Sequence, residues 1–410
     1  MKIERVVLSE GKTGFYFDDQ AAIKAGASND GLRYVGDPIT NGFDMIRIPG
    51  ESISVQLVLS DKQVALGDCV AVQYSGASGR EPLFIAKTYI KELEEVVVPW
   101  LKGLELNSFI ECSKKLETLE YNGHPLHTGI KYGVSLALLD AFAKANHLSI
   151  AQFIQKEYKL QFPIKRVPIF TQSGDDRYLA ADKMILKNVE ALPHALINNV
   201  ETKLGKDGSK LKEYLVWLMD RIKEIGSADY KPTIHLDVYG TIGEAFNLDI
   251  KKQAQYIKEL EELVKPFPLV IEGPMDAGSK NKQIKQLQDL VVELKNIDSK
   301  AKIVADEWCN NLEDIKEFVD AKAGDIMQIK TPDLGCIHNT IEAVLYCNEN
   351  NIGGYVGGSC NETDVSSRIT TNVALASGAV QILAKPGMGV DEAYMIVYNE
   401  MNRIISLLES

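Results

Sequence analysis

Four charged residues follow four successive apolar segments in the second half of the chain. Asp237 ends TIHLD, Glu272 follows PLVI, Asp306 follows KIVA and Lys330 follows IMQI. A charge at the end of a core strand is costly to bury unless it is paired, bound to a metal or used in catalysis. Neighbouring carboxylates repel one another unless a cation joins them, and carboxylate oxygens without His or Cys are ligands for Mg²⁺ or Mn²⁺. The carboxylates could instead cap helices or pair with lysine or arginine, but their recurrence at successive strand ends favours a metal site.

The Lys330 side chain allows three interpretations. It could neutralise the carboxylates, form a Schiff base with a carbonyl substrate, or act as a general base. A base must lose its proton near neutral pH, and a nearby divalent cation lowers the pKa of an amine in that direction. Sites that abstract a proton beside a carboxylate with the help of Mg²⁺ use a lysine or histidine base. We therefore favour Lys330 as a general base.

Other polar residues lie at or near the ends of further predicted strands. His194 follows the second predicted strand, where it could act as an acid or base on the opposite face of the substrate, although a lone histidine is more often structural. Gln328 and Lys330 are two positions apart and so share one face of a strand. An amide there could hold a substrate carboxylate or amine, with satisfied interior packing as the alternative. The remaining candidates are Gln73 beside the loop YSGASGR, Gln172, Ser359 and Cys360, the last of which could equally fill a core.

A regular alternation of short apolar runs with long amphipathic stretches begins near residue 165 and would position these side chains. Such alternation is typical of a parallel sheet covered by helices. The predicted strands are VPIFTQ, a second near ALPHALINNVETKL, TIHLDV, PLVIEG, KIVADE, DIMQIK, IGGYVGG and QILAK. Eight strands with about eight helices match an α/β protein of the (β/α)8 TIM-type barrel class, whose active site lies where the C-terminal strand ends converge. An open doubly wound sheet is the alternative, but VPIFTQSGDDRY lacks the expected G-x-G-x-x-G turn.

The first 160 residues follow a different pattern. MKIERVVLSE and MIRIPGESISVQLVLSD alternate apolar and polar residues, as antiparallel strands do, and helical patterns follow them. With 410 residues, the chain exceeds what one compact core usually holds. We therefore predict an α+β domain at residues 1–160 and a barrel domain at residues 161–410.

The composition argues against several classes of function. The net charge is −12 and no basic stripe is visible, which disfavours a nucleic-acid-binding protein. The six cysteines form no CxxC pair, the N-terminus has no long apolar stretch, and no segment approaches the length of a membrane span. We expect a cytoplasmic protein that binds a small molecule and neither nucleic acid nor membrane.

Taken together, these residues resemble the 3-methylaspartate ammonia-lyase family of the enolase superfamily along essentially the whole chain. The three carboxylates alone would indicate only the superfamily, whereas QIKTPDLG, GGSCNETD and ALPH are more specific. The resemblance implies an N-terminal α+β capping domain packed on the barrel. It also implies the reversible elimination of ammonia from L-threo-3-methylaspartate to give mesaconate, in amino-acid degradation. The segments that carry the resemblance are VAVQYSG, FTQSGDD, ALPHALIN, HLDVYGTIG, IEGPMDAG, VADEWCN, QIKTPDLG, GGSCNETD and KPGMGVDE.

The resemblance further implies a role for each candidate residue. It implies that Asp237, Glu272 and Asp306 hold Mg²⁺. It implies that Lys330 removes the C3 proton and that His194 acts on the opposite face and can serve the erythro epimer. Ser359 stands where relatives carry threonine, so the hydroxyl persists while the packing against the substrate methyl can differ. Activation by a monovalent cation such as K⁺ and a homodimer are further expectations. The substrate-binding residues implied are Gln73, Gln172, His194, Gln328, Ser359 and Cys360.

Three other functions fit parts of the pattern. Another Mg²⁺-dependent lyase, racemase or cycloisomerase of the superfamily usually presents K-x-K on the second barrel strand, whereas ETKLGK supplies Lys203 without that arrangement. A Schiff-base aldolase would use Lys330 as a nucleophile. A non-catalytic scaffold is expected to have lost the charged set, yet the three carboxylates and the lysine are all present.

Overall fold

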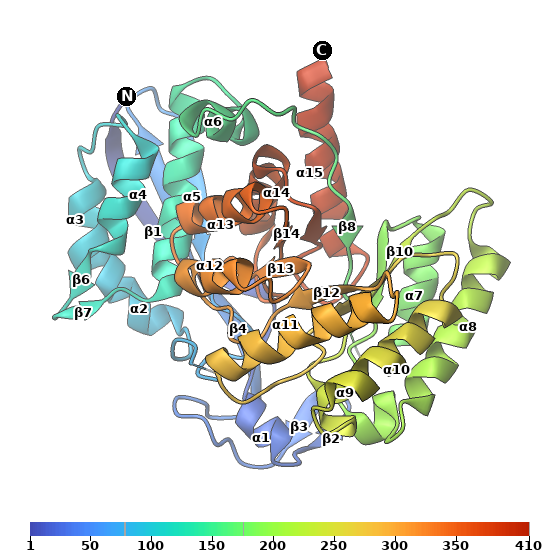
Figure 1. Ribbon diagram of the computed structural model, residues 1–410. Coiled ribbons are helices and arrows are strands. Elements are labelled where there is room, and N and C mark those ends of the chain that lie inside the picture. The colour runs from blue at the N-terminus through green and yellow to red at the C-terminus, as the bar shows by residue number, and fades with distance from the viewer. Residues whose placement is uncertain (78, 175, 410) are drawn as a thin grey trace.

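The second half of the chain forms a closed barrel of eight parallel strands (Figure 1). The computed structural model describes residues 1–77, 79–174 and 176–409; Ser78 of the loop YSGASGR, Asp175 of FTQSGDD and Ser410 lie outside the described residues. The predicted barrel is confirmed, and the open doubly wound alternative is wrong. The strands are β8 (Ile169–Phe170), β9 (Ala191–His194), β10 (Thr233–Asp237), β11 (Leu269–Glu272), β12 (Lys302–Ala305), β13 (Ile326–Ile329), β14 (Gly353–Val356) and β15 (Gln381–Leu383).

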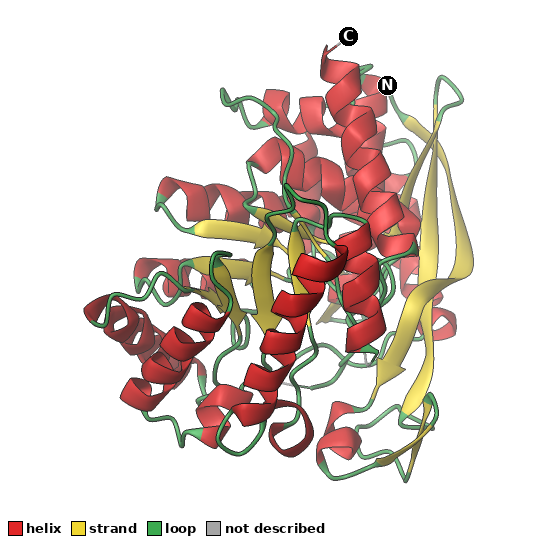
Figure 2. Cartoon of the chain, turned by 90° about the vertical axis from the view of Figure 1, so that its right-hand side faces the viewer, coloured by secondary structure: helices red, strands yellow, loops and turns green. Residues whose placement is uncertain are grey.

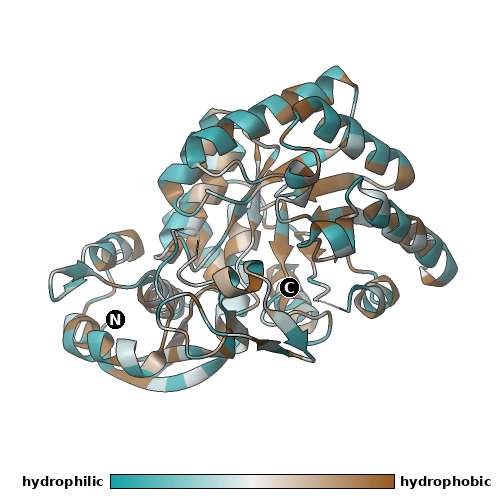
Figure 3. Ribbon diagram, turned by 90° about the horizontal axis from the view of Figure 1, so that it is seen from below, coloured by the Kyte–Doolittle hydropathy of each residue, from teal (hydrophilic) through white to brown (hydrophobic). Residues whose placement is uncertain are grey.

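Helices connect successive strands and cover the outside of the barrel. Each buries one face, as in α10, where Ala254, Ile257 and Leu260 recur at helical spacing and Asp249 caps the first turn by accepting a hydrogen bond from Lys252 N. Figure 3 shows this division, with mainly hydrophobic strands inside and hydrophilic colour on the outer faces of the helices. The helices are α7 (Arg177–Leu186), α8 (Ser209–Ile225), α9 (Thr241–Ala245), α10 (Ile250–Leu263), α11 (Lys280–Asn296), α12 (Leu312–Asp320), α13 (Ile337–Glu349), α14 (Asp364–Ser377) and α15 (Glu392–Glu409), with a π-helical turn at Val200–Leu204.

An apolar cluster inside the barrel forms the floor beneath the C-terminal strand ends. Alternate residues of each strand point inward, so the cluster and the charged residues occupy the same inward-facing rows. His235 stacks on Phe170 with the ring centroids 4.0 Å apart. Asp237, Glu272 and Asp306 each lie two residues beyond an inward-facing position of this layer. The cluster comprises Phe170, Ala191, Val270, Val304, Ile326, Tyr355 and Leu383.

The N-terminal part is built on an antiparallel sheet in the order β1-β4-β5, with strands β1 (Ile3–Asp18), β4 (Arg47–Leu59) and β5 (Val64–Cys69). Figure 2 shows this long sheet running along one side of the helix-covered barrel. Helix α5 (Thr128–Ala145) packs closely on β5. This is possible because Gly133 has no side chain, since a Cβ at this position would lie 2.2 Å from Cys69 N. The other elements are α1 (Gln20–Lys24), β2 (Ser28–Asp30), β3 (Arg33–Val35), α2 (Ala86–Glu92), a π-helical turn (Leu93–Val97), α3 (Val98–Leu101), α4 (Phe109–Glu117), β6 (Glu120–Tyr121), β7 (His124–Pro125) and α6 (Ile150–Glu157).

Two features of the N-terminal part differ from the sequence pattern. The pattern predicts a strand over the first ten residues, but β1 extends to Asp18 because a register shift between Lys12 and Tyr16 absorbs the glycine-containing segment and lets pairing with β4 continue. Helix α1 and the short hairpins carry no clear periodicity and were not predicted.

Among the described residues, no helix combines the length and the apolar character needed to cross a membrane.

Candidate active site

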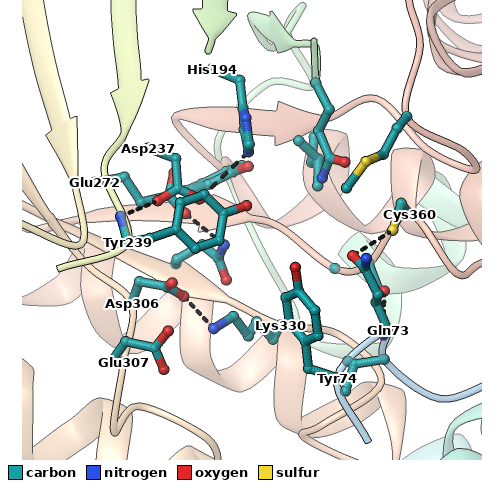
Figure 4. A pocket seen from close by; sticks show the side chains of 18 of the residues that line it. Gln73, Tyr74, His194, Asp237, Tyr239, Glu272, Asp306, Glu307, Lys330 and Cys360 are labelled. Atoms are coloured by element: carbon teal, nitrogen blue, oxygen red, sulfur yellow. Dashed lines mark hydrogen bonds and ion pairs between the residues drawn. The ribbon is translucent and has the colours of Figure 1, made fainter. Parts of the chain in front are cut away.

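A pocket lies at the C-terminal ends of the barrel strands, where the active sites of such barrels are found (Figure 4). Residues of the N-terminal part, including Gln73 and Tyr74, close one side of the pocket. The structure therefore brings all the sequence-predicted candidates together. They are Gln73, Gln172, His194, Asp237, Glu272, Asp306, Gln328, Lys330, Ser359 and Cys360.

The three carboxylates reach the pocket from three neighbouring strands. Asp237 and Glu272 end β10 and β11 and lie opposite each other in the parallel register, and Asp306 follows β12 by one residue. Asp237 Oδ1 accepts a hydrogen bond of 3.2 Å from Tyr239 N. Glu272 Oε1 accepts one of 2.7 Å from Gln328 Nε2. These two contacts hold the Asp237 and Glu272 carboxylates in place without neutralising their charge.

The electrostatics of the three carboxylates fit a hard divalent cation. Burial, followed by the charges of Asp237 and Asp306, raises the pKa of Glu272 well above its usual range. A bound cation would offset both the burial of this charge and its repulsion by the neighbouring carboxylates. The donors are all oxygens, as Mg²⁺ prefers. Among the described residues, these three carboxylates do not form a set whose oxygens all lie within 4.8 Å of one another.

A second cluster of ligand-type side chains lies between α4 and α13, outside the pocket. Glu117, Cys336 and His338 place their ligand atoms within 4.8 Å of one another. The carboxylate of Glu117, however, already accepts hydrogen bonds from Cys336 N at 3.1 Å and from Asn339 Nδ2 at 2.9 Å. It also pairs with the Lys131 ammonium at 3.4 Å. This cluster is accounted for as a satisfied polar contact between the two helices.

Lys330 follows β13 by one residue and directs its ammonium group to Asp306 Oδ1. Both side chains are largely buried. Burial disfavours the charged form of Lys330, but the Asp306 carboxylate offsets this effect, so the pKa of Lys330 lies above its ordinary value. The nearby Arg80 guanidinium opposes that rise. The amine therefore stays protonated for as long as Asp306 remains its partner.

His194 ends β9 and faces the pocket from the side opposite Lys330 (Figure 4). Its Nδ1 accepts a hydrogen bond of 3.2 Å from Leu196 N, which leaves the ring proton on Nε2. Nε2 lies 3.4 Å from Asp237 Oδ2. His194, Ala195 and Leu196 have φ values of 64°, 69° and 47°. Three successive residues in the left-handed region are energetically costly, and such strain is concentrated at functional sites.

The N-terminal part and the loop after β14 meet at Gln73. Gln73 N donates a hydrogen bond of 3.1 Å to Ser359 Oγ, and Cys360 Sγ lies 3.2 Å from Gln73 Oε1 as a donor. Gln73 Nε2 donates to Asp18 Oδ2 at 2.6 Å. Burial raises the pKa of the Cys360 thiol, so it is a neutral donor and not a thiolate nucleophile. Gln172 Oε1 is buried in the same pocket and has no hydrogen-bond partner among the described residues.

Sequence reasoning missed several residues that line the pocket. Tyr239 follows Asp237 by two positions in HLDVYG, so its proximity to a predicted ligand was an available signal. Arg80 was a second signal, as the one basic residue of YSGASGR. Its buried guanidinium pairs with Asp333 at 3.0 Å and with Glu307 at 3.8 Å, and so fastens the loop to the barrel. The residues missed include Tyr74, Arg80, Tyr239, Glu307, Tyr355, Leu383 and Met388.

Comparisons with known proteins cover the whole chain. A family model described as methylaspartate ammonia-lyase N-terminus matches residues 1–159, and one described as methylaspartate ammonia-lyase C-terminus matches residues 161–410. The methylaspartate ammonia-lyase of Clostridium tetanomorphum is 54% identical over 409 residues, which span 100% of this chain and 99% of that protein.

Solved structures show the same similarity. The Mg complex of β-methylaspartase from Clostridium tetanomorphum matches with a TM-score of 0.97 at 54% identity, over 100% of this chain and 99% of that chain. The methylaspartate ammonia lyase of Citrobacter amalonaticus, in a structure containing (2S,3S)-3-methylaspartic acid, matches with a TM-score of 0.98 at 51% identity over 100% of both chains. An L-Ala-D/L-Glu epimerase from Bacillus subtilis, 16% identical, shares the fold with a TM-score of 0.64 over 96% of this chain and 91% of that chain.

Proposed function

Since this chain belongs to the methylaspartate ammonia-lyase family and is a lyase, we propose that it eliminates ammonia reversibly from L-threo-3-methylaspartate to give mesaconate, with Mg²⁺ as its cofactor. One observation supports this most strongly. The pocket places the Lys330 amine beside three carboxylates at the barrel mouth, in a chain 51% identical to a relative whose structure contains (2S,3S)-3-methylaspartic acid. The same pocket holds polar groups suited to a small amino-acid substrate with two carboxylates.

In this proposal Lys330 is the base that acts at C3. The proton there is weakly acidic, because its removal places a second negative charge on the adjoining carboxylate. When held by Asp237, Glu272 and Asp306, Mg²⁺ supplies positive charge that offsets this second charge. Lys330 Nζ must be deprotonated to act. The Asp306 carboxylate opposes this by raising the pKa of Lys330, so Asp306 must first bind the cation, and the neighbouring Arg80 charge then favours the neutral amine. Nζ takes the C3 proton, the electron pair passes through the enolate into a C2=C3 double bond, and ammonia leaves C2.

His194 serves the opposite face of the substrate. Its Nε2 is directed into the pocket while Nδ1 is held by the backbone of Leu196, so the ring has one functional nitrogen. In the erythro epimer the C3 proton lies on that face. For His194 Nε2 to remove it in place of Lys330, the ring must carry its own proton on Nδ1, so the contact between Nδ1 and Leu196 N has to open first.

The amide and hydroxyl groups bind and orient the substrate. Gln172 Oε1 and Gln328 Oε1 are buried acceptors without partners among the described residues, and a substrate ammonium group supplies the missing donors. Ser359 and Cys360 offer a hydroxyl and a thiol from the loop after β14, beside Gln73. Because Gln73 belongs to the N-terminal part, this contact also closes the pocket against water.

Further parts of the proposal rest on the sequence. Activation by K⁺, a homodimer and a role in amino-acid degradation come from the family resemblance. The use of Mn²⁺ in place of Mg²⁺ comes from the oxygen ligands, and a cytoplasmic location comes from the composition. The division into a capping domain at residues 1–160 and a catalytic barrel at residues 161–410 comes from the change in sequence pattern.

An absorbance assay tests the proposal directly. Purified protein with Mg²⁺ and L-threo-3-methylaspartate should produce mesaconate, seen as the ultraviolet absorbance of its conjugated double bond. EDTA should abolish the signal, and excess Mg²⁺ should restore it. Turnover of another acid without mesaconate would instead identify a different lyase, racemase or cycloisomerase. Trapping of a substrate adduct on Lys330 by borohydride, with activity insensitive to EDTA, would favour the Schiff-base alternative.

A further inference from the structure

A second buried lysine lies directly behind the pocket. Lys385 follows β15 by two residues and pairs with Glu362, at 2.8 Å between Nζ and Oε1. Both side chains are 0% exposed, unlike those of the other ion pairs among the described residues that join a lysine or arginine to a carboxylate. Neither residue lines the pocket. The pair is therefore outside the set of groups that can touch the substrate.

The ammonium group of Lys385 uses all three of its protons within the protein. Besides Glu362, it donates to Gly357 O at 2.7 Å and to Thr331 Oγ1 at 3.0 Å. Gly357 opens the loop after β14, and Thr331 is the residue next to Lys330. The ammonium group thus ties the backbone of the loop after β14 to the turn that carries the base.

The Glu362 carboxylate is equally engaged. Its Oε1 accepts from Ser359 N at 3.2 Å and from Thr331 Oγ1 at 3.1 Å. Its Oε2 accepts from the Tyr132 hydroxyl at 2.8 Å, and Tyr132 belongs to α5 of the N-terminal part. One carboxylate therefore joins three segments: the loop that carries Ser359 and Cys360, the turn after β13, and the N-terminal part.

The pair also packs against the loop backbone without any intervening side chain. Gly358 has φ +133°, and a Cβ at this position would lie 2.2 Å from Glu362 Oε1 and 2.3 Å from Lys385 Nζ. The loop can follow this path only because residue 358 has no side chain. A buried ion pair is weak evidence for stability, because well-packed apolar residues often replace one without loss. What distinguishes this pair is instead the number of segments around the pocket that it joins.

We propose that Lys385 and Glu362 are positioning residues for the reaction. They hold the Ser359–Cys360 loop and the turn after Lys330 at fixed places relative to each other, so that the substrate-binding groups and the base face the same substrate atoms. This inference rests on the proposed function. It assigns the pair no contact with substrate or metal.

Paired substitutions test the proposal while avoiding an isolated buried charge. In Lys385→Met/Glu362→Gln the amide can still accept from Ser359 N, whereas Lys385→Met/Glu362→Leu loses every polar contact. We expect kcat/KM for 3-methylaspartate to fall about 10–100-fold in the first and further in the second, as for loss of groups that orient others. KM should rise and kcat fall together. The Mg²⁺ dissociation constant, measured by calorimetry without substrate, should change less than about twofold, because the carboxylates lie on other strands.

Two single variants keep the test decisive if the double variants fold poorly. Thr331→Val removes only the hydroxyl that bridges the pair and the Lys330 turn, and should lower kcat about tenfold with little change in the melting temperature. Lys131→Met removes the neighbouring α5 lysine, which pairs with Glu117 outside the pocket, and should leave the kinetic constants within about twofold. Unchanged kcat and KM in folded Thr331→Val protein would overturn the inference. Absence of mesaconate production by the unaltered protein would instead overturn the proposed function.

Discussion

Lys330 and Lys385 occupy equivalent places in the barrel but different surroundings. Each lies just past the C-terminal end of a strand, β13 or β15, and each contacts one carboxylate. Lys330 faces the pocket, whereas Lys385 is fully enclosed. For Lys330, the effect of burial is offset by Asp306, and the pKa is raised. For Lys385, burial outweighs the pull of Glu362, and the pKa is lowered.

Spare hydrogen-bonding capacity is what would distinguish the proposed base, Lys330, from the proposed positioning residue, Lys385. Lys385 donates its three ammonium protons to Glu362, Gly357 and Thr331. No donor of this ammonium group therefore remains for a substrate. Lys330 borders the pocket, and its carboxylate partner Asp306 could instead bind a cation there. A lysine at a strand end is therefore informative only together with what surrounds it.

The largest expected effect is the loss of activity in Lys330→Ala. Removal of a general base typically costs about 10²–10⁴-fold in rate. We expect the turnover of the threo substrate, measured by mesaconate absorbance, to fall by at least about 10²-fold. Mg²⁺ binding by calorimetry should persist, because the three carboxylates remain. Appreciable residual threo activity would contradict the assigned role.

Substitution of one carboxylate should distinguish the proposed metal ligands from the second cluster of ligand-type side chains around Glu117. Glu272→Gln deletes a charge at the most buried of the three carboxylates and should weaken Mg²⁺ binding by about 100-fold or more. Glu117→Gln is the matched control, because Glu117 also lies near two ligand-type side chains. Calorimetry should show unchanged Mg²⁺ affinity for the control variant. Equal losses in both variants would mean that the pocket carboxylates are not the metal ligands.

The two lysines should differ in their contribution to stability. Lys385→Met leaves the Glu362 carboxylate buried without its cation, which typically costs about 3–5 kcal/mol. Lys330→Met in saturating Mg²⁺ should cost less than about 1 kcal/mol, because the metal then compensates Asp306. Urea unfolding measures both values. A larger loss for the Lys330 variant would reverse the comparison.

The barrel and the charged set could be predicted because their signals are local in the sequence. Each of Asp237, Glu272, Asp306 and Lys330 directly follows or ends an apolar run, and all eight predicted strands are present. Lys385 follows the run QILA in the same way, yet the sequence offered no reason to single it out. Its partners come from the loop after β14, the turn after β13 and α5, and only the folded chain brings these segments together.

A smaller effect is expected for His194→Ala, and it should depend on the epimer. If His194 removes the proton of the erythro substrate, its loss should cost that reaction about 10²-fold or more. The threo reaction should lose about tenfold or less, because Lys330 remains while one binding group is gone. Mesaconate production from each purified epimer gives both ratios. Equal losses on both epimers would count against assignment of the two groups to opposite faces.

The smallest effect concerns the pH dependence of stability, where the two lysines should have opposite signs. The pKa of Lys385 is lowered in the folded protein. Between that pKa and the ordinary value near 10.4, the unfolded chain binds the extra proton, so this contribution to stability rises with pH. The pKa of Lys330 is raised, so its contribution is fully present below about 10.4 and is lost as the pH passes through the folded value. We therefore expect urea unfolding in EDTA between about pH 8 and 11 to show opposite trends. The stability difference between the unaltered protein and Lys385→Met/Glu362→Gln should grow with pH, and that for Lys330→Met should shrink. Trends of the same sign would show that the two lysines share one kind of environment.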